Sequence, residues 1–270
     1  MRKNSPWRGL VIVLFMIYML VPVLATLLFS FATRWDRTIF PEGLSVEWWK
    51  AVTGRRAFGM TLRNSLFISF GAMVLSILLV TPVAYWTHLR VPRARPLVEF
   101  FTILPFGIPG VVLALALIRC YAKLGATIVY SPGMLIAACM VISLPFMYRP
   151  VTNALNAADV KRLTEAAHSL GAGWFMTMTR VIAPNIMSGI ASGALLVFST
   201  VFVEFTLANL LVGARFKTFP IYLVEFTRFD GRQASALAVI SFAFAWLFSL
   251  AVLLVMGKGS GAREGAAGAR

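Results

Sequence analysis

The sequence predicts an all-α integral membrane protein with six transmembrane helices. Apolar and aromatic residues make up 59% of the 270 residues, and charged residues make up only 13%. The mean hydropathy is +0.82. A typical soluble domain has about 25% charged residues, and one core of this size cannot hide so much apolar surface. A soluble enzyme is therefore excluded, and so is a disordered chain, because disorder requires few apolar residues.

The length and the continuity of the apolar runs are two further observations that predict this fold class. A hydrocarbon core of about 30 Å requires about 20 helical residues. The runs are continuous rather than alternating, so transmembrane strands are a poor alternative. The predicted spans are 10–32, 65–87, 97–118, 133–152, 186–207 and 234–256. They form a single transmembrane domain over 1–256, followed by a short tail at 257–270.

The first span follows Arg2, Lys3 and Arg8, as the apolar part of a signal peptide would. It is long for a cleaved signal and five spans follow it, so we expect a retained helix. Six spans place both termini on one side of the membrane. Of the 25 basic residues, thirteen fall on that side and twelve on the other, so the positive-inside rule barely discriminates.

The net charge of +15 would suggest nucleic-acid binding in a soluble protein. Here the basic residues lie mostly between apolar runs, which indicates anchoring to anionic lipid instead. Cys120 and Cys139 form neither a disulfide framework nor a metal site, and two histidines are too few for one.

The loop at 153–185 is the most patterned segment outside the spans. Asp159 is a plausible N-cap for a helix that continues to about Leu170. One apolar stripe on this helix is formed by Leu163, Ala166, Ala167 and Leu170. Small side chains let another surface approach the backbone closely. The loop folds back on its own bundle, lies in the headgroups, or docks into a groove on a partner protein.

The end of this helix is predicted at two glycines. Gly171 and Gly173 can both break it by adopting positive φ. A second short helix is expected over 174–180. Pro184 then lies near the start of the fifth span, where its missing N–H costs little.

Residues 165–167 (Glu-Ala-Ala), followed after three residues by Gly171 and later by Pro184, resemble the EAA motif. That motif marks permease subunits of binding-protein-dependent bacterial ABC importers. The segments 64–66 and 105–112 also resemble the family. The family pattern has an aliphatic residue three positions before the proline and usually a leucine directly before it. Val181 and Ala183 occupy these positions here, and both are mild departures.

The resemblance implies a six-helix type I ABC importer transmembrane domain in the bacterial inner membrane, with both termini cytoplasmic. The loop would form the cytoplasmic coupling helix, which sits in a cleft on an ATPase subunit. The residues that would couple to the ATPase are Glu165, Ala166, Ala167, Leu170 and Gly171. The implied partners are an ATPase dimer, a second permease expected to be a different chain, and a periplasmic binding protein.

The chain has no Gly-x4-Gly-Lys-Ser/Thr phosphate loop, because 257–260 lacks the earlier glycine. We therefore expect no catalytic residue and no bound cofactor, with ATP and Mg²⁺ on the partner ATPase. The segments 35–44, 202–206 and 219–222 resemble polyamine-type permeases and their 2-aminoethylphosphonate relatives. Thiamine, sulfate and ferric iron permeases share the architecture.

Glu204, Pro105 and Pro109 are the candidate residues of a translocation path. An acidic residue inside a span should face the bundle interior or a wet cavity, where Glu204 would meet an amine-bearing solute or make an internal hydrogen bond. The prolines either kink their helix beside the path or belong to ordinary helix packing.

Two other classes of protein remain as alternatives. A secondary carrier or channel for a small cation would need coupling carboxylates, for which Glu204 is the single candidate, and it would leave the 153–185 loop unexplained. A membrane enzyme would need a cluster such as His-Glu-x-x-His, which is absent from the sequence.

Overall fold

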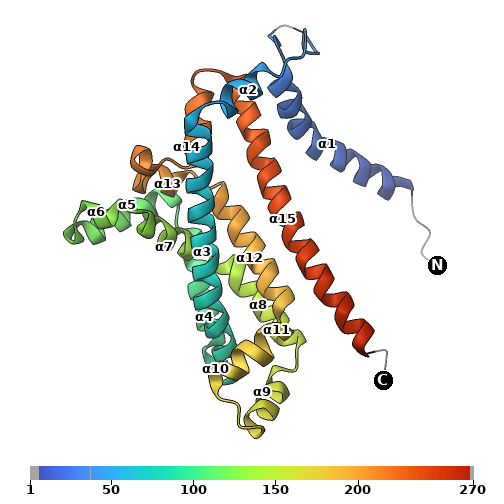
Figure 1. Ribbon diagram of the computed structural model, residues 1–270, viewed down its shortest axis with the longest axis vertical. Coiled ribbons are helices and arrows are strands. Elements are labelled where there is room, and N and C mark those ends of the chain that lie inside the picture. The colour runs from blue at the N-terminus through green and yellow to red at the C-terminus, as the bar shows by residue number, and fades with distance from the viewer. Residues whose placement is uncertain (1–5, 37, 268–270) are drawn as a thin grey trace. The chain divides into compact units, whose positions relative to one another are not determined.

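The computed structural model describes residues 6–36 and 38–267, and these are helical apart from connecting turns and one isolated β-bridge between Ala32 and Leu44. Three helices are individually long and apolar enough to cross a membrane. Three further pairs of helices pass the same test together, each pair bent at a short break. The described residues therefore provide up to six spans, in agreement with the predicted fold class (Figure 1).

The helices have the following bounds. The α-helices are α1 (Pro6–Phe31), α2 (Glu47–Thr53), α3 (Arg56–Leu89), α4 (Arg95–Ile103), α5 (Gly110–Tyr121), α6 (Ala126–Val129), α7 (Pro132–Ile142), α8 (Leu144–Ala157), α9 (Val160–Ser169), α10 (Trp174–Met176), α11 (Ala183–Asn185), α12 (Met187–Phe202), α13 (Thr206–Leu211), α14 (Phe219–Thr227) and α15 (Gly231–Ala267). The other helical turns are η1 (Pro92–Ala94), η2 (Leu104–Gly107), η3 (Ala122–Leu124), the π-helical η4 (Thr177–Ile182) and η5 (Gly213–Phe216).

Two compact units make up the chain. The first comprises Met1–Met60 and Tyr222–Phe244, and the second comprises Thr61–Ile221 and Ala245–Arg270. Arg2 and Lys3 lie outside the described residues. The segment at 257–267, predicted as a tail, continues helix α15.

Arg232 is the centre of a cluster of polar contacts in the first unit. The guanidinium group of Arg232 lies 4.3 Å from the ring centroid of Trp48 and donates to the backbone oxygen of Thr33. The indole of Trp48 donates to the backbone oxygen of Ala32 at 2.9 Å. Asp230 accepts from the backbone N–H and side chain of Arg232 and from the Gln233 amide. Partial burial opposes ionisation of Asp230, but these hydrogen bonds prevail and lower its pKa.

The closest helix crossing in the second unit joins α12 to α8, and two glycines make it possible. A Cβ on Gly189 would lie 2.5 Å from both the Ala154 Cβ and the Pro150 backbone oxygen. A Cβ on Gly193 would lie 2.7 Å from the Met147 Sδ. Small residues at membrane helix interfaces allow this approach of two backbones.

Three of the apolar runs are bent rather than straight. The third run bends by 100° between residues 107 and 110. The fourth run bends by 51° at Ser143, and the chain bends by 80° at Ile186, where the fifth run begins. Prolines accompany each break, because proline removes a backbone donor and clashes with the preceding turn. The fifth run, predicted to continue to 207, is helical only to Phe202 and resumes as α13.

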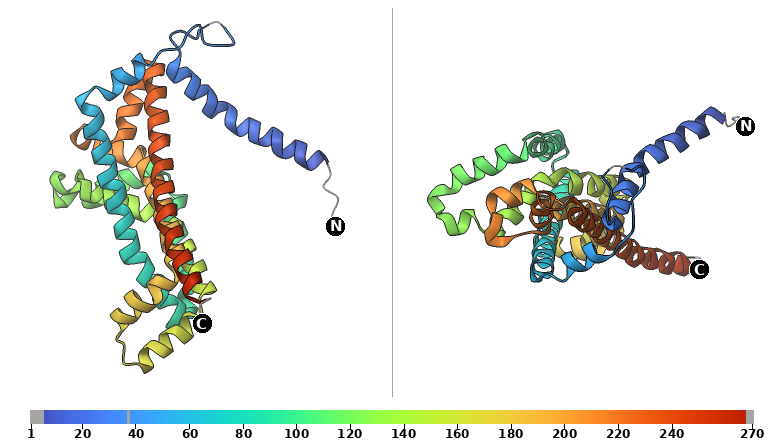
Figure 2. Two further views of the ribbon diagram at one scale, coloured as in Figure 1. Left: turned by 45° about the vertical axis from the view of Figure 1, so that its right-hand side comes forward. Right: turned by 90° about the horizontal axis from the view of Figure 1, so that it is seen from above.

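Helix α9 stands at one end of the second unit, next to the last turns of α3 (Figures 1 and 2). The predicted loop at 153–185 thus consists of the last turn of α8, then α9, a turn, and the helical stretch α10–η4–α11.

Candidate functional site

Helix α9 begins where the sequence predicts it. The Asp159 carboxylate accepts a hydrogen bond from the Arg162 backbone N–H at 3.4 Å, and it lies 3.2 Å from the Arg162 Nε. The side-chain acceptor satisfies one of the free backbone donors that every helix start exposes. The ion pair itself is solvent-exposed and contributes little to stability.

The same helix ends at Gly171, which has φ of 78°. The Gly171 N–H donates to the His168 oxygen at 2.9 Å, and the Ala172 N–H donates to the Ala167 oxygen at 3.0 Å. These two bonds form a Schellman motif, in which glycine takes the left-handed position because it has no Cβ. Gly173 was expected to share this role, and that expectation is wrong. Its φ is −71°, and it starts α10 in an extended conformation.

Helix α9 presents two different faces. Val160, Thr164 and Ala167 are buried against the rest of the second unit. Glu165, Ala166 and the other residues around the helix end are exposed, and Leu170 is 88% exposed. The predicted apolar stripe is therefore divided, because Ala167 packs inward while Ala166 and Leu170 face outward. The loop is partly folded on its own bundle and still leaves one face open.

Large apolar side chains are also exposed beyond the Gly171 turn. Trp174, Phe175 and Met176 are all exposed in α10. We define the coupling face as Glu165, Ala166, Leu170, Gly171 and residues 174–176. Contiguous exposed apolar side chains rimmed by polar ones mark interaction sites. Sequence reasoning did not include 174–176 in the site, although three large apolar residues in a polar loop were an available signal.

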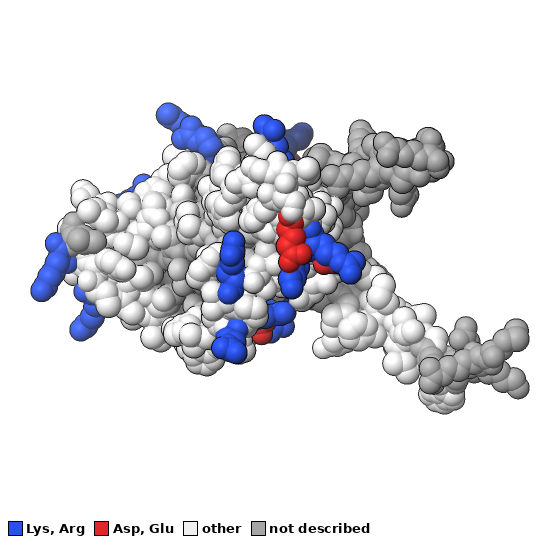
Figure 3. Space-filling model, turned by 90° about the horizontal axis from the view of Figure 1, so that it is seen from below, with Lys and Arg blue, Asp and Glu red and all other residues white. Residues whose placement is uncertain are grey.

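The charged side chains around this end of the molecule are mostly basic. Figure 3 views it from below, and blue Lys and Arg side chains there outnumber red acidic ones. The loop itself exposes Lys161, Arg162 and Arg180 together with the acidic residues Asp159 and Glu165.

The stretch after the turn returns the chain to the membrane. The predicted short helix at 174–180 continues as the π-helical turn η4 and then as α11, which contains Pro184. Met178 and Ile182 are buried and anchor this stretch to the unit. The 80° bend at Ile186 then leads into α12.

Glu204 lies in the break between α12 and α13 rather than inside a continuous span. Its two carboxylate oxygens accept hydrogen bonds from the Leu207 and Ala208 backbone N–H groups, each at 3.0 Å. The half-buried side chain therefore caps α13 and also borders a small cavity of about 10 Å³. The cavity is lined by Ser65, Ile68, Leu135, Cys139, Val201, Glu204, Ala208 and Thr218.

Pro105 and Pro109 lie at the 100° bend of the third run. Pro105 is buried in η2, and Pro109 is the N-cap residue of α5. A Cβ on the neighbouring Gly110 would lie 3.5 Å from the Thr206 side chain, so the starts of α5 and α13 approach closely. Neither proline lines the Glu204 cavity. The α5 end of this bend therefore lies near α13, whereas the η2 end packs against α4 and α7.

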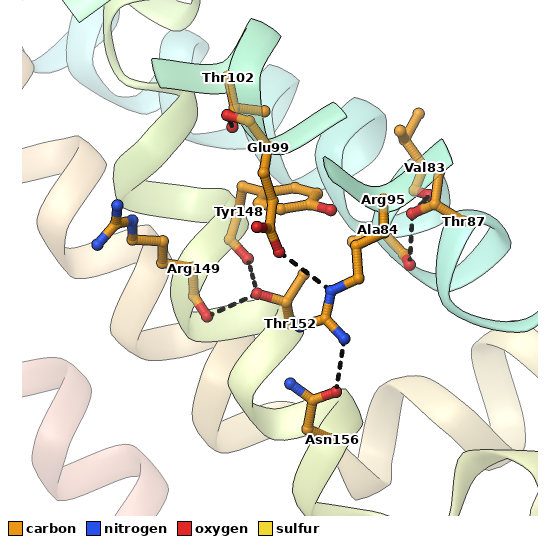
Figure 4. Close-up of polar contacts among 10 residues, drawn as sticks. All are labelled: Val83, Ala84, Thr87, Arg95, Glu99, Thr102, Tyr148, Arg149, Thr152 and Asn156. Carbon is orange, nitrogen blue, oxygen red and sulfur yellow. Dashed lines mark hydrogen bonds and ion pairs between the residues drawn. The ribbon is translucent and has the colours of Figure 1, made fainter. Parts of the chain in front are cut away.

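A polar cluster between α4 and α8 was not predicted (Figure 4). Arg95 Nε donates to Glu99 at 3.0 Å, and its terminal nitrogen donates to the Asn156 side chain at 3.2 Å. These contacts tie the start of α4 to the end of α8, beside a cavity of about 230 Å³. Glu99 lies in the third apolar run, where hydropathy averaging hides a single carboxylate.

No metal site is apparent in the described part of the chain, which has no group of three or more His, Cys, Asp or Glu side chains able to hold an ion. Cys120 is exposed and Cys139 is buried, and both are free thiols.

A family profile matches residues 81–259, which is more than half of the chain. The profile describes the "Binding-protein-dependent transport system inner membrane component". This chain belongs to that family. It is therefore a multi-pass inner membrane permease of a binding-protein-dependent ABC importer. Permease subunits are non-catalytic, so ATP hydrolysis belongs to a separate subunit.

Relatives of the permease include polyamine transport proteins. The spermidine/putrescine permease PotB of Haemophilus influenzae is 29% identical over 213 residues, covering 73% of this chain and 74% of the relative. PotC of Escherichia coli is 22% identical over 242 residues, covering 88% and 89%. At these identities the relatives are similar proteins, and the family is shown by the profile match.

Solved structures share the fold. A bacterial ABC transporter that imports alginate matches with a TM-score of 0.71 and 15% identity, covering 92% of both chains. The same kind of transporter in complex with an alginate-bound periplasmic protein matches with a TM-score of 0.68 and 15% identity, covering 93% of this chain and 91% of the other.

The family assignment decides against the alternatives of a secondary carrier, a channel or a membrane enzyme.

Proposed function

We propose that this permease forms half of the translocation path for a small amine-bearing solute and that its coupling face docks on a cytoplasmic ATPase. The observation that carries the docking proposal is the division of α9 into a buried face and an exposed one. Val160, Thr164 and Ala167 fix the helix to the membrane bundle. The opposite side exposes polar residues of α9 together with Leu170, and Phe175 of α10 is also exposed.

The orientation follows from the proposed partner. If α9 meets a cytoplasmic ATPase, the inner ends of α3, α8 and α9 are cytoplasmic, and six spans then place both termini on that side. A periplasmic binding protein would deliver the solute to the opposite face. PotB and PotC are separate permeases of spermidine/putrescine transport systems, which supports a second permease that is a different chain.

Glu204 is the proposed contact for a cationic group on the solute. Its carboxylate is half-buried beside a small, mostly apolar cavity, at a break where helix ends replace continuous helix. Broken helices at membrane depth are tolerated where they line a cavity or pack within protein. Pro105 and Pro109 would supply the bend that lets this region open. Either a polyamine-like solute or an aminophosphonate would bring the required ammonium group.

The docking proposal is tested by paired glycine variants in the complete transporter, reconstituted in proteoliposomes. Gly171→Ala forces a Cβ into a left-handed position, whereas the matched Gly173→Ala meets open space at negative φ. We expect Gly171→Ala and Glu165→Lys to lower uptake per ATP hydrolysed, and Gly173→Ala to leave it unchanged. Normal coupling in both Gly171→Ala and Glu165→Lys would refute the docking role.

The solute proposal is tested by uptake of labelled spermidine, putrescine and 2-aminoethylphosphonate. Glu204→Gln keeps an oxygen that can cap α13 but removes the negative charge. We expect this variant to lose affinity for the transported amine while the protein still assembles. Uptake at wild-type rate and affinity by Glu204→Gln would remove Glu204 from the path.

A further inference from the structure

We infer that Tyr85 is a positioning residue that transmits the movement of α9 to α3 and, through α3, to the cavity beside Glu204. The inference rests on the proposed docking of α9 and assigns the transmission to one contact. That contact is the hydrogen bond between the Tyr85 hydroxyl and the Thr164 hydroxyl, at 3.0 Å.

The direction of this hydrogen bond follows from its surroundings. Thr164 Oγ1 donates its single proton to the Val160 backbone oxygen at 2.7 Å. Its lone pairs are therefore left to accept, and Tyr85 is the donor. Both side chains are buried, with 3% of Tyr85 and 9% of Thr164 exposed. A buried hydroxyl that loses its partner keeps the full cost of desolvation, so this contact between α3 and α9 is costly to break.

Besides its packing against η4, α9 contacts α3 through the Tyr85–Thr164 hydrogen bond. Among the described residues, this is the one hydrogen bond that joins α3 to α9. Tyr85 and Val160 also both belong to the buried apolar cluster of the second unit. Other contacts of α9 lead to η4 and so to the fifth run.

The far half of α3 reaches the proposed path. Asn64 donates to the Lys217 backbone oxygen at 2.9 Å, and the Phe219 backbone N–H donates to Ser65 at 2.8 Å. Ser65 also lines the cavity that Glu204 borders. Twenty residues separate Ser65 from Tyr85, which corresponds to about 30 Å of helix. Helix α3 runs over this whole length with one proline inside it, Pro82, so the proposed path from Tyr85 to the Glu204 cavity follows α3 and crosses that proline.

The test uses the complete transporter with its ATPase, second permease and binding protein. Tyr85→Phe and Thr164→Val each remove one hydroxyl with little change in shape, and the double variant removes both. The measured quantity is ATP hydrolysed per solute imported. We expect each single variant to raise this ratio about two- to tenfold, the effect of losing one buried hydrogen bond. The double variant should be no worse than the more severe single variant.

Two controls separate transmission from simple destabilisation. Thr164→Ser keeps the hydroxyl and should restore coupling, and Tyr121→Phe removes an exposed hydroxyl at the end of α5 and should leave the ratio unchanged. An unchanged ratio in Tyr85→Phe, or additive effects in the double variant, would overturn the inference. If Gly171→Ala still uncouples transport in that case, the docking proposal survives. If no α9 variant changes the ratio, the docking proposal and the inference about Tyr85 both fail.

Discussion

Replacing Gly189 by alanine perturbs the contact on which the α8–α12 pair depends. The new Cβ would lie 2.5 Å from the Pro150 backbone oxygen and 2.5 Å from the Ala154 Cβ. The optimal separation of two non-bonded carbon atoms is about 3.5–4.0 Å, so the helices must separate by about 1 Å. The Pro150 oxygen belongs to the backbone, and it cannot rotate away as a flexible side chain would.

The expected cost is the difference between two effects. Overpacking of a tight interior costs about 1–3 kcal/mol, and the backbone contact places this site near the upper limit. Alanine also stabilises a helix by about 1 kcal/mol relative to glycine. The net loss of unfolding free energy should therefore be about 2 kcal/mol.

The assay is detergent-induced unfolding of the purified permease, followed by circular dichroism. Gly59→Ala is the matched control, because a Cβ at Gly59 in α3 meets nothing within 4 Å. It should leave stability unchanged or increase it by up to about 1 kcal/mol. Adding Ala154→Gly to Gly189→Ala should recover part of the loss, since one of the two close contacts disappears. If Gly189→Ala is as stable as wild type, the crossing is looser than the structure indicates.

Three further predictions concern carboxylates. Asp159→Ala should fray the start of α9 and weaken it by about 1 kcal/mol, seen as faster amide hydrogen exchange, whereas Asp159→Asn should retain the cap. Glu204→Ala should destabilise α13 more than Glu204→Gln does, because only Gln keeps an acceptor for Leu207 or Ala208; equal melting temperatures would contradict the capping role. The lowered pKa of Asp230 means that its stabilisation is complete above about pH 3.9, the pKa of a free Asp, and is lost as the pH falls through the lower folded value. The acid-dependent part of thermal stability should therefore shrink in Asp230→Asn.

Local signals allowed much of α9 to be predicted from the sequence. The Asp159 cap and the Gly171 turn depend on residues within a few positions of each other, which a sequence displays directly. Gly173 misled the prediction because a glycine permits positive φ without requiring it. The two Schellman hydrogen bonds need one left-handed residue, and Gly171 already fills that position.

Features that depend on distant contacts could not be predicted. Hydropathy continues through 203–211, so the break at Glu204 looks like uninterrupted span until its carboxylate is seen to cap α13. Tyr85 and Thr164 are 79 positions apart, and nothing in the periodicity of either segment pairs them. The prolines of the third run indicated a kink, but its 100° angle depends on how α5 packs against α13.

The most direct measurement is site-specific photo-cross-linking from Leu170 in the assembled transporter. This side chain is 88% exposed at the centre of the coupling face. A photoreactive amino acid at Leu170 should cross-link to the ATPase subunit, and the same probe at Phe229, which is 85% exposed far along the sequence in the other unit, should not. Cross-links from Leu170 to lipid or to this permease alone would contradict the account.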